Sequence, residues 1–237
     1  MGTPLKLNLG CGYKPQEGFI NCDYMDGPGV QAVFDVQKKP WPFDDNSVGV
    51  VTSYHMLEHL SDWQTFFEEL WRVCAPGANL SFQLPYGPSN DGMAEPGHLK
   101  YWLPTSFCAL QPSYAEAVGN LQHRDLKMAF DVHFLGCAVN KNLLWLCRWP
   151  WKRWGLQLLW YLFSGHYELI VGMHALKTQE QIDDFLRRRP PALGSVVPVT
   201  QVAWLHHWNP KEYEEKGRPA ELVTLNEGVS VWNKEKK

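Results

Sequence analysis

Short apolar strands alternate with helical stretches over the first ninety residues, and this alternation restricts the fold more than any other feature of the chain. The clearest strand, Ser47–Ser53, is β-branched and apolar on both faces, as in a central strand of a parallel sheet. Residues Asp62–Cys74 repeat apolar side chains at three-to-four spacing, which predicts an amphipathic helix stopped by Pro76 and Gly77. Because strands that alternate with helices form parallel sheets with crossover helices, we expect an α/β fold.

Weaker patterns predict the remaining elements. Further strands are expected at Leu5–Leu9, Phe19–Cys22, Val30–Val36, Asn79–Leu84, Lys127–Leu135 and His166–Met173, with an edge strand at Val196–Leu205. Helices are expected at Pro104–Leu110 and Glu180–Arg189, and the proline- and glycine-rich segment Pro85–Pro96 predicts a long functional loop. We divide the chain into one domain at residues 1–190, with an aromatic-rich insertion at 136–165, and a C-terminal appendage at 191–237.

Charge and cysteine content narrow the function classes. The chain of 237 residues has 22 Lys+Arg against 25 Asp+Glu, a formal net charge of −3, which argues against a protein that coats nucleic acid. Its six cysteines form no CxxC pair and lie mostly in apolar runs, which favours free thiols in a reducing compartment. The first residues also lack a charged-then-apolar leader, so we expect a cytoplasmic protein.

A glycine pair and a carboxylate lie where a nucleotide site would need them. Gly10 and Gly12 directly follow the first expected strand, and Asp23 ends the second. Glycines allow a ligand to approach the backbone closely, and a carboxylate accepts hydrogen bonds from two ribose hydroxyls. The pair alone is a weak signal, because many turns contain two glycines.

Four segments strengthen this signal by their order along the chain: LNLGCG (7–12), GFINCDY (18–24), FDV (34–36) and SYHMLEHL (53–60). Together with the helix, Pro-Gly turn and strand of 62–84, this series resembles the class I S-adenosylmethionine-dependent methyltransferases, in particular methyltransferase type 11. The resemblance covers residues 5–110 and extends more loosely to about 190. It implies a Rossmann-like, mostly parallel seven-stranded sheet flanked by helices, S-adenosyl-L-methionine as cofactor, and a methyl acceptor whose class the residues leave open.

The resemblance also implies which residues bind the cofactor. They lie at the carboxyl ends of the first four strands: Gly10, Cys11, Gly12, Asp23, Tyr24, Asp35, Val36, Ser53 and Tyr54. The glycine loop would line the methionine part, Asp23 would bind the ribose hydroxyls, and Asp35 would accept from the adenine amino group. Tyr24 would pack beside the ribose or adenine, and Val36 would present its amide to the ring. Ser53 and Tyr54 would lie near the sulfonium.

The chain departs from the family pattern in its first crossover. Lys14 occupies the position where a third glycine is common, and Gly12 is only eleven residues from Asp23. Ordinary dinucleotide folds place their acidic residue about 20 residues further on. We therefore expect a shortened first crossover helix.

Two histidines are candidates for catalysis. His55 follows the fourth expected strand and would face the cofactor. His98 follows the long loop, where the family often places a histidine on the substrate side, so it could take a proton from an acceptor hydroxyl or amine. A structural role for His98 is the alternative interpretation.

Residues His55, Glu58 and His59 also fit HxxEH, a zinc-hydrolase pattern that needs both histidines on one face of a helix. Because His55 comes directly after a strand, we expect no metal and keep the hydrolase as a remote alternative. A second alternative is a catalytically silent nucleoside-binding module that serves assembly or partner binding.

Twelve tryptophans are unevenly distributed, and nine of them lie from Trp102 onward. Five fall within Leu143–Phe163, where three basic residues and Pro150 argue against a membrane span. We favour a packed insertion there, with contact to a membrane surface or a protein as the alternative and nucleic acid as the less favoured one. The oligomeric state has no sequence signal.

Overall fold

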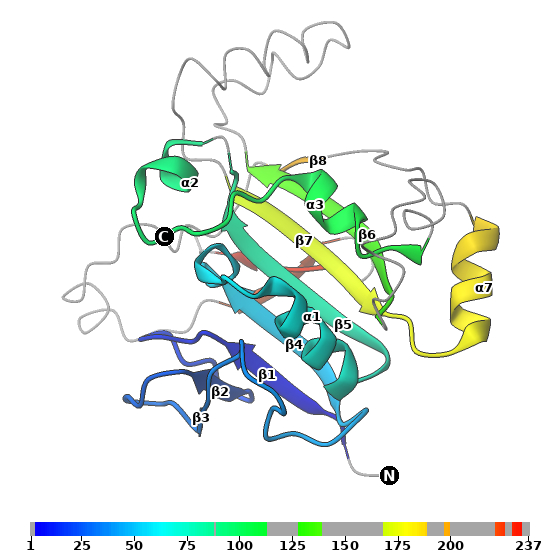
Figure 1. Ribbon diagram of the computed structural model, residues 1–237, viewed down its shortest axis with the longest axis horizontal. Helices are drawn as coiled ribbons and strands as arrows, with labels where there is room; N and C mark the ends of the chain where they lie inside the picture. The colour runs from blue at the N-terminus through cyan, green and yellow to red at the C-terminus, as the bar shows by residue number, and fades with distance from the viewer. Residues whose placement is uncertain are drawn as a thin grey trace, which may run out of the picture.

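A mostly parallel sheet forms the centre of the protein, as the computed structural model in Figure 1 shows. The structure describes residues 3–87, 89–112, 128–138, 168–188, 197–199, 221–225 and 229–233. The sheet strands are β1 (Leu5–Leu9), β2 (Ile20–Asp23), β3 (Ala32–Val33), β4 (Val48–Tyr54), β5 (Cys74–Pro85), β6 (Phe130–Ala138), β7 (Glu168–Ala175) and β8 (Val197–Val199). They lie in the order β3-β2-β1-β4-β5-β7-β6-β8.

Strand direction follows the expected α/β class. Strands β1 to β5 pair in parallel, whereas β7 lies antiparallel between β5 and β6. The seven-stranded, mostly parallel sheet is therefore confirmed, and β8 adds an eighth strand parallel to β6. A separate antiparallel pair, β9 (Glu221–Leu225) and β10 (Val229–Asn233), was not predicted from the sequence.

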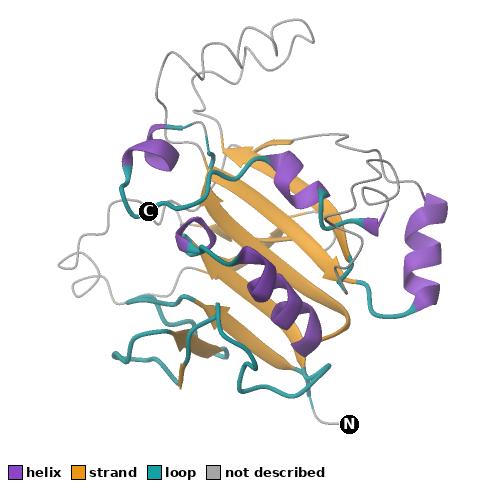
Figure 2. Cartoon of the chain, in the orientation of Figure 1, coloured by secondary structure: helices purple, strands orange, loops and turns teal. Residues whose placement is uncertain are grey.

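Helices α1 and α3 lie against the face of the sheet that is turned toward the viewer in Figure 2. The described helices are α1 (Trp63–Val73), α2 (Asn90–Ala94), α3 (Pro104–Cys108), α7 (Gln179–Arg188) and the 3-10 turn η1 (Leu57–His59). Asp62 caps α1, because its side chain accepts a hydrogen bond from the Thr65 amide at 3.0 Å. No helix of the described residues is long and apolar enough to cross a membrane.

The expected loop Pro85–Pro96 was wrong in part, because it contains the short helix α2, and three expected boundaries differ most from the structure. Only Ala32 and Val33 of the expected strand Val30–Val36 pair, because their partner β2 ends at Asp23. Strand β5 begins at Cys74, directly after α1, and Pro76 and Gly77 lie inside it rather than in a connecting turn. Strand β6 lies three residues further along the chain than expected, because it extends to Ala138 beside β7.

Edge-to-face aromatic contacts hold α1 on the sheet. The ring of Phe67 lies 5.0–6.5 Å from those of five other aromatic side chains: Phe66, Phe82, Trp102, Phe107 and Phe130. These rings come from α1, β5, α3, β6 and the segment before α3, and all are buried. Such pairs contribute about 0.5–1.5 kcal/mol each beyond the burial of their area. The apolar face of α1 therefore connects both halves of the sheet.

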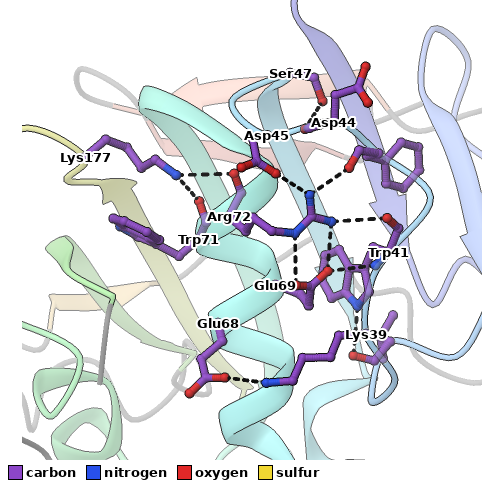
Figure 3. A network of polar contacts seen from close by, with 12 residues as sticks. Lys39, Trp41, Asp44, Asp45, Ser47, Glu68, Glu69, Trp71, Arg72 and Lys177 are labelled. Atoms are coloured by element: carbon purple, nitrogen blue, oxygen red, sulfur yellow. Dashed lines mark hydrogen bonds and ion pairs between the residues drawn. The ribbon is translucent and has the colours of Figure 1, made fainter. Parts of the chain in front are cut away.

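A polar network fixes the other side of α1 (Figure 3). Arg72 donates to Glu69 at 2.9 and 2.8 Å and to the Trp41 carbonyl at 3.1 Å, while Glu69 accepts from the Trp41 amide at 2.7 Å. Lys177, just after β7, donates to the Trp71 carbonyl at 2.6 Å. The helix is thereby fastened to the loop before β4 and to the end of β7 by charge-assisted hydrogen bonds.

Residues 10–19, which connect β1 to β2, contain no helix, so the expected shortening of the first crossover is confirmed. Hydrogen bonds of buried side-chain amides hold this connection where a helix would otherwise pack. Asn21 accepts from Asn8 Nδ2 at 2.8 Å and from the Gln16 amide at 2.7 Å, and it donates to the Gln16 carbonyl at 3.1 Å. Asn8 and Asn21 are register partners on β1 and β2. The loop is therefore held against the sheet by hydrogen bonds that replace the packing of a helix.

Replacing Asn21 with Ala tests this network. The change leaves the Gln16 amide and the Asn8 side chain without their partner in a buried site, so we expect a loss of about 2–4 kcal/mol in the free energy of unfolding. Urea denaturation measures this loss. The control Gln64→Ala removes an exposed hydrogen bond on α1 and should change stability by less than about 0.5 kcal/mol. Equal stability of both variants would contradict the role of Asn21.

Two histidines stack across the pair β6 and β7. The rings of His133 and His174 lie 4.1 Å apart at 19°, and neither ring nitrogen of His133 has a hydrogen-bond partner among the described residues. Burial and the nearby His174 lower the pKa of His133 to about 4, although Asp131 acts in the opposite direction. Asp131 itself pairs with Arg188 at 3.3 Å. His133 is therefore neutral in the folded protein near neutral pH.

This lowered pKa makes stability depend on pH. Between the folded pKa of about 4 and the ordinary value of 6.5, the unfolded chain binds the proton more tightly. The contribution of His133 to the free energy of unfolding is therefore fully present above pH 6.5. It decreases as the pH falls from 6.5 toward 4, because the unfolded chain is then protonated first. After discounting for partial exposure, we expect a loss on the order of 1–2 kcal/mol. Urea denaturation at several pH values should show a shallower decline for His133→Phe, and an unchanged profile would refute this origin.

Candidate functional site

A cleft of about 540 Å³ opens at the carboxyl ends of β1, β2 and β4, the edge of a parallel sheet where ligands bind. Its walls combine the glycine loop, two aspartates, two histidines and several apolar side chains. The lining residues are Gly10, Gly12, Asp23, Tyr24, Phe34, Asp35, Val36, Gln37, His55, Met56, His59 and Leu60.

The glycine loop at the bottom of the cleft requires its glycines. Gly10 has a φ of +66°, and a Cβ at this position would lie 2.5 Å from Cγ of Met56. Gly12 has a φ of +50°, and its amide donates to Asp23 Oδ2 at 2.8 Å. The other oxygen of Asp23 accepts from the Met25 amide at 3.1 Å. Each oxygen keeps a further lone pair, so the carboxylate still has acceptor capacity toward the cleft.

Another part of the cleft lining comes from the residues directly after β3. Asp35 accepts from the Gln37 amide at 3.0 Å and pairs with Lys38 at 3.4 Å on the surface. The Gln37 side chain accepts from the amides of Ser61 and Asp62 at 2.8 and 2.9 Å, so this wall is fastened to the start of α1. Tyr24, which also lines the cleft, is 71% exposed.

The structure places most of the expected cofactor residues around the cleft, but not all. The lining includes Gly10, Gly12, Asp23, Tyr24, Asp35 and Val36. Cys11, Ser53 and Tyr54 lie outside it. Cys11 and Ser53 are buried, at 5% and 0% exposure, and burial raises the pKa of the Cys11 thiol to about 11, so the thiol stays protonated. The side chains of Cys11 and Ser53 therefore lie in the interior and not in the cleft lining.

Sequence reasoning missed five lining residues: Phe34, Gln37, Met56, His59 and Leu60. Four of them belong to the FDV and SYHMLEHL segments, so the segments themselves carried the signal. Gln37 carried no sequence signal. Its place in the cleft lining depends on the start of α1 lying close to the segment after β3.

His55 lies in the cleft between two buried carboxylates. Its Nδ1 is 3.4 Å from Glu58 Oε1 and its Nε2 is 3.2 Å from Glu168 Oε2, and both carboxylate side chains are 2% exposed. Burial by itself lowers the pKa of His55, but Glu168 and Glu58 outweigh this effect and raise the pKa to about 10. His55 is therefore an imidazolium at neutral pH, which donates hydrogen bonds and cannot accept a proton.

His98 occupies a different position from the one expected for a residue on the substrate side. Its side chain is 8% exposed and does not line the cleft. Nδ1 lies 2.9 Å from the Gly92 carbonyl, and Nε2 lies 4.0 Å from Glu58 Oε1. Its ring packs edge-to-face on that of His59, with centroids 4.9 Å apart.

The HxxEH segment does not form the helix that a zinc hydrolase of this pattern uses. His55 has a left-handed backbone with φ of 50°, and η1 contains only three residues. His55 and His59 therefore do not share the face of an α-helix.

Other expected features lie outside the described residues. These are the whole tryptophan-rich segment 143–163 and most of the appendage 191–237, of which only 197–199, 221–225 and 229–233 are described. Of the six cysteines, the four described in full are free and buried: Cys11, Cys22, Cys74 and Cys108.

Comparison with known proteins gave one family match and several similar solved structures. The model of the methyltransferase domain family, Methyltransf_11, matches residues 8–82. No match was found among curated proteins. Similar solved structures include YcgJ from Bacillus subtilis, with 11% identity, 74% of this chain and 93% of that chain covered, and a TM-score of 0.46. An S-adenosylmethionine-dependent methyltransferase from Archaeoglobus fulgidus has 14% identity, coverages of 73% and 86%, and a TM-score of 0.46. One from Mesorhizobium loti has 12% identity, coverages of 72% and 90%, and a TM-score of 0.43.

The matched segment contains the glycine loop, both cleft aspartates and the SYHMLEHL segment. The resemblance found in the sequence is therefore confirmed, and S-adenosylmethionine is the cofactor of that family. Residues 8–82 of this chain thus match the methyltransferase domain model, and they lie on a Rossmann-like, mostly parallel sheet.

Proposed function

We propose that the protein is an enzyme that transfers the methyl group of S-adenosyl-L-methionine to an oxygen or nitrogen nucleophile of an acceptor. One observation carries the proposal: the segment that matches the family brings two left-handed glycines and two aspartates to one cleft at the carboxyl edge of the sheet. A cleft of about 540 Å³ is within the size range of small-molecule and cofactor sites.

The proposed binding mode uses the residues around the cleft. Gly10 and Gly12 let the methionine part approach the backbone, while Asp23 accepts from the ribose hydroxyls. Asp35 accepts from the adenine amino group and the Val36 amide faces the ring. Cys11, Ser53 and Tyr54, which do not line the cleft, would act through the residues that do.

The described residues favour positioning over proton abstraction. Methyl transfer from a sulfonium proceeds by in-line attack of the acceptor, and the cofactor itself supplies the leaving group. The protein must hold the two reactants in line and exclude water. We propose that the cationic His55 positions the cleft wall through its contacts with Glu58 and Glu168, because both ring nitrogens face these carboxylates and its raised pKa removes it as a base. His98 would reach an acceptor only from the edge of the cleft.

The proposal also includes a cellular compartment and a partner-binding segment. Four buried free thiols suit a reducing compartment such as the cytoplasm. Contact with a membrane surface or a protein partner through residues 143–163 remains a proposal from sequence, since that segment lies outside the described residues.

Calorimetry with S-adenosylhomocysteine tests the binding step. The wild-type chain should bind one molecule, and Asp23→Asn should weaken binding about 10- to 100-fold, because hydrogen bonds to a charged group contribute about 1.5–3 kcal/mol. Asp26→Asn is the matched control, since Asp26 is exposed and does not line the cleft.

Absence of binding by the wild type, or equal binding by Asp23→Asn, would refute the proposal. Transfer of a labelled methyl group to fractionated cell extract then separates an enzyme from a silent nucleoside-binding module, which would bind the cofactor without transferring the group.

A further inference from the structure

Three potential metal ligands meet at the edge of the cleft. Glu58, His59 and His98 each place one ligand atom within 4.8 Å of the other two. Glu58 and His59 come from η1, whereas His98 comes from the segment between α2 and α3. This set differs from the HxxEH set, because His98 replaces His55 and Glu58 is itself a ligand candidate.

Glu58 is buried, and both of its carboxylate oxygens can still accept hydrogen bonds. Its side chain is 2% exposed, and neither carboxylate oxygen accepts a hydrogen bond from the described residues. The nearest charged group is His55, whose Nδ1 lies 3.4 Å from Oε1. A carboxylate removed from water is costly unless charge and hydrogen bonds compensate. The Glu58 carboxylate has only long contacts with His55 and His98 among the described residues, which marks an incomplete site.

Both histidines are oriented as metal ligands usually are. Nδ1 of His59 lies 2.9 Å from the Gly97 carbonyl, and Nδ1 of His98 lies 2.9 Å from the Gly92 carbonyl. A carbonyl only accepts, so each Nδ1 carries a proton and each Nε2 of the neutral ring keeps its lone pair. Backbone carbonyls that fix the tautomer in this way are the usual support of metal-binding histidines.

Backbone hydrogen bonds hold the two segments together. The amides of Leu99 and Lys100 donate to the Glu58 carbonyl at 2.8 and 3.1 Å, and Trp102 Nε1 donates to the Leu57 carbonyl at 3.1 Å. The position of His98 beside Glu58 is therefore built into the fold. This rigidity is what a site of defined coordination geometry needs.

We propose that Glu58, His59 and His98 bind a divalent transition-metal ion, with Zn²⁺ as the probe, through one carboxylate oxygen and the two Nε2 atoms. The 4.0 Å between His98 Nε2 and Glu58 Oε1 is slightly wider than the ligand separation of about 3.4 Å in a tetrahedral site with bonds of 2.0–2.1 Å. A small side-chain rotation closes this difference.

Two histidines and a carboxylate leave at least one coordination position open, as in catalytic rather than structural sites. Because His59 also lines the cleft, the ion lies at the cleft edge, where an oxygen of an acceptor can take the open position. This last step rests on the proposed methyl transfer, whereas the metal site does not.

Isothermal titration with Zn²⁺ tests the site in the full-length chain without a histidine tag, after treatment with EDTA and exchange into metal-free buffer. The wild type should bind one ion per chain. Glu58→Gln and His59→Gln should each lower the affinity at least about tenfold, since each removes a ligand. Because His59 is exposed, His59→Gln is expected to fold normally. Controls with the same changes elsewhere, Glu180→Gln and His174→Gln, should bind as the wild type does.

A second readout uses Co²⁺, whose visible absorption reports ligand number and geometry. The wild type should show the bands of a four- or five-coordinate ion, and His59→Gln should lose them. Failure of the wild type to bind either metal, or unchanged binding by both Glu58→Gln and His59→Gln, would overturn the site. S-adenosylhomocysteine binding measured on the same samples distinguishes this failure from failure of the proposed function.

Discussion

Buried amide hydrogen bonds between the first two strands are the interaction on which the cofactor end of this protein depends. A parallel pair normally needs a crossover of a dozen residues or more, usually a helix, to bring the second strand beside the first. Here only residues 10–19 make the connection, and Asn8, Gln16 and Asn21 hold it against the sheet. Asp23 ends the strand that Asn21 fixes. The network therefore also sets the position of the Asp23 carboxylate relative to the glycine loop.

The same cleft shows how burial changes the chemistry of a histidine. Burial favours the neutral imidazole, but two carboxylates at 3.2 and 3.4 Å reverse that preference for His55. His133, stacked on another histidine, remains neutral because burial outweighs the nearby Asp131. His55 is thus a cation held between two buried carboxylates in this protein.

The sheet class and most residues of the cleft lining were predictable because they depend on local order along the chain. Apolar strands, the glycine pair and Asp23 lie within short segments whose carboxyl ends must share one edge of a parallel sheet. Strand limits were less predictable, because a strand ends where its partner ends, as β3 does beside β2. Cys11 and Ser53 follow the family pattern in sequence, but burial turns them away from the cleft lining.

By itself, the sequence determined the α/β class, the shortened first crossover and the rim that carries Gly10, Gly12, Asp23 and Asp35, because these follow from periodicity and from the spacing of neighbouring segments. Only the tertiary structure decided the charge of His55 and the meeting of Glu58 with His98. Glu168 lies more than a hundred residues from His55, and His98 lies forty residues from Glu58. Both the charge of a buried histidine and the geometry of a ligand set depend on groups that are distant along the chain. No local sequence pattern gives the distance between such groups after packing.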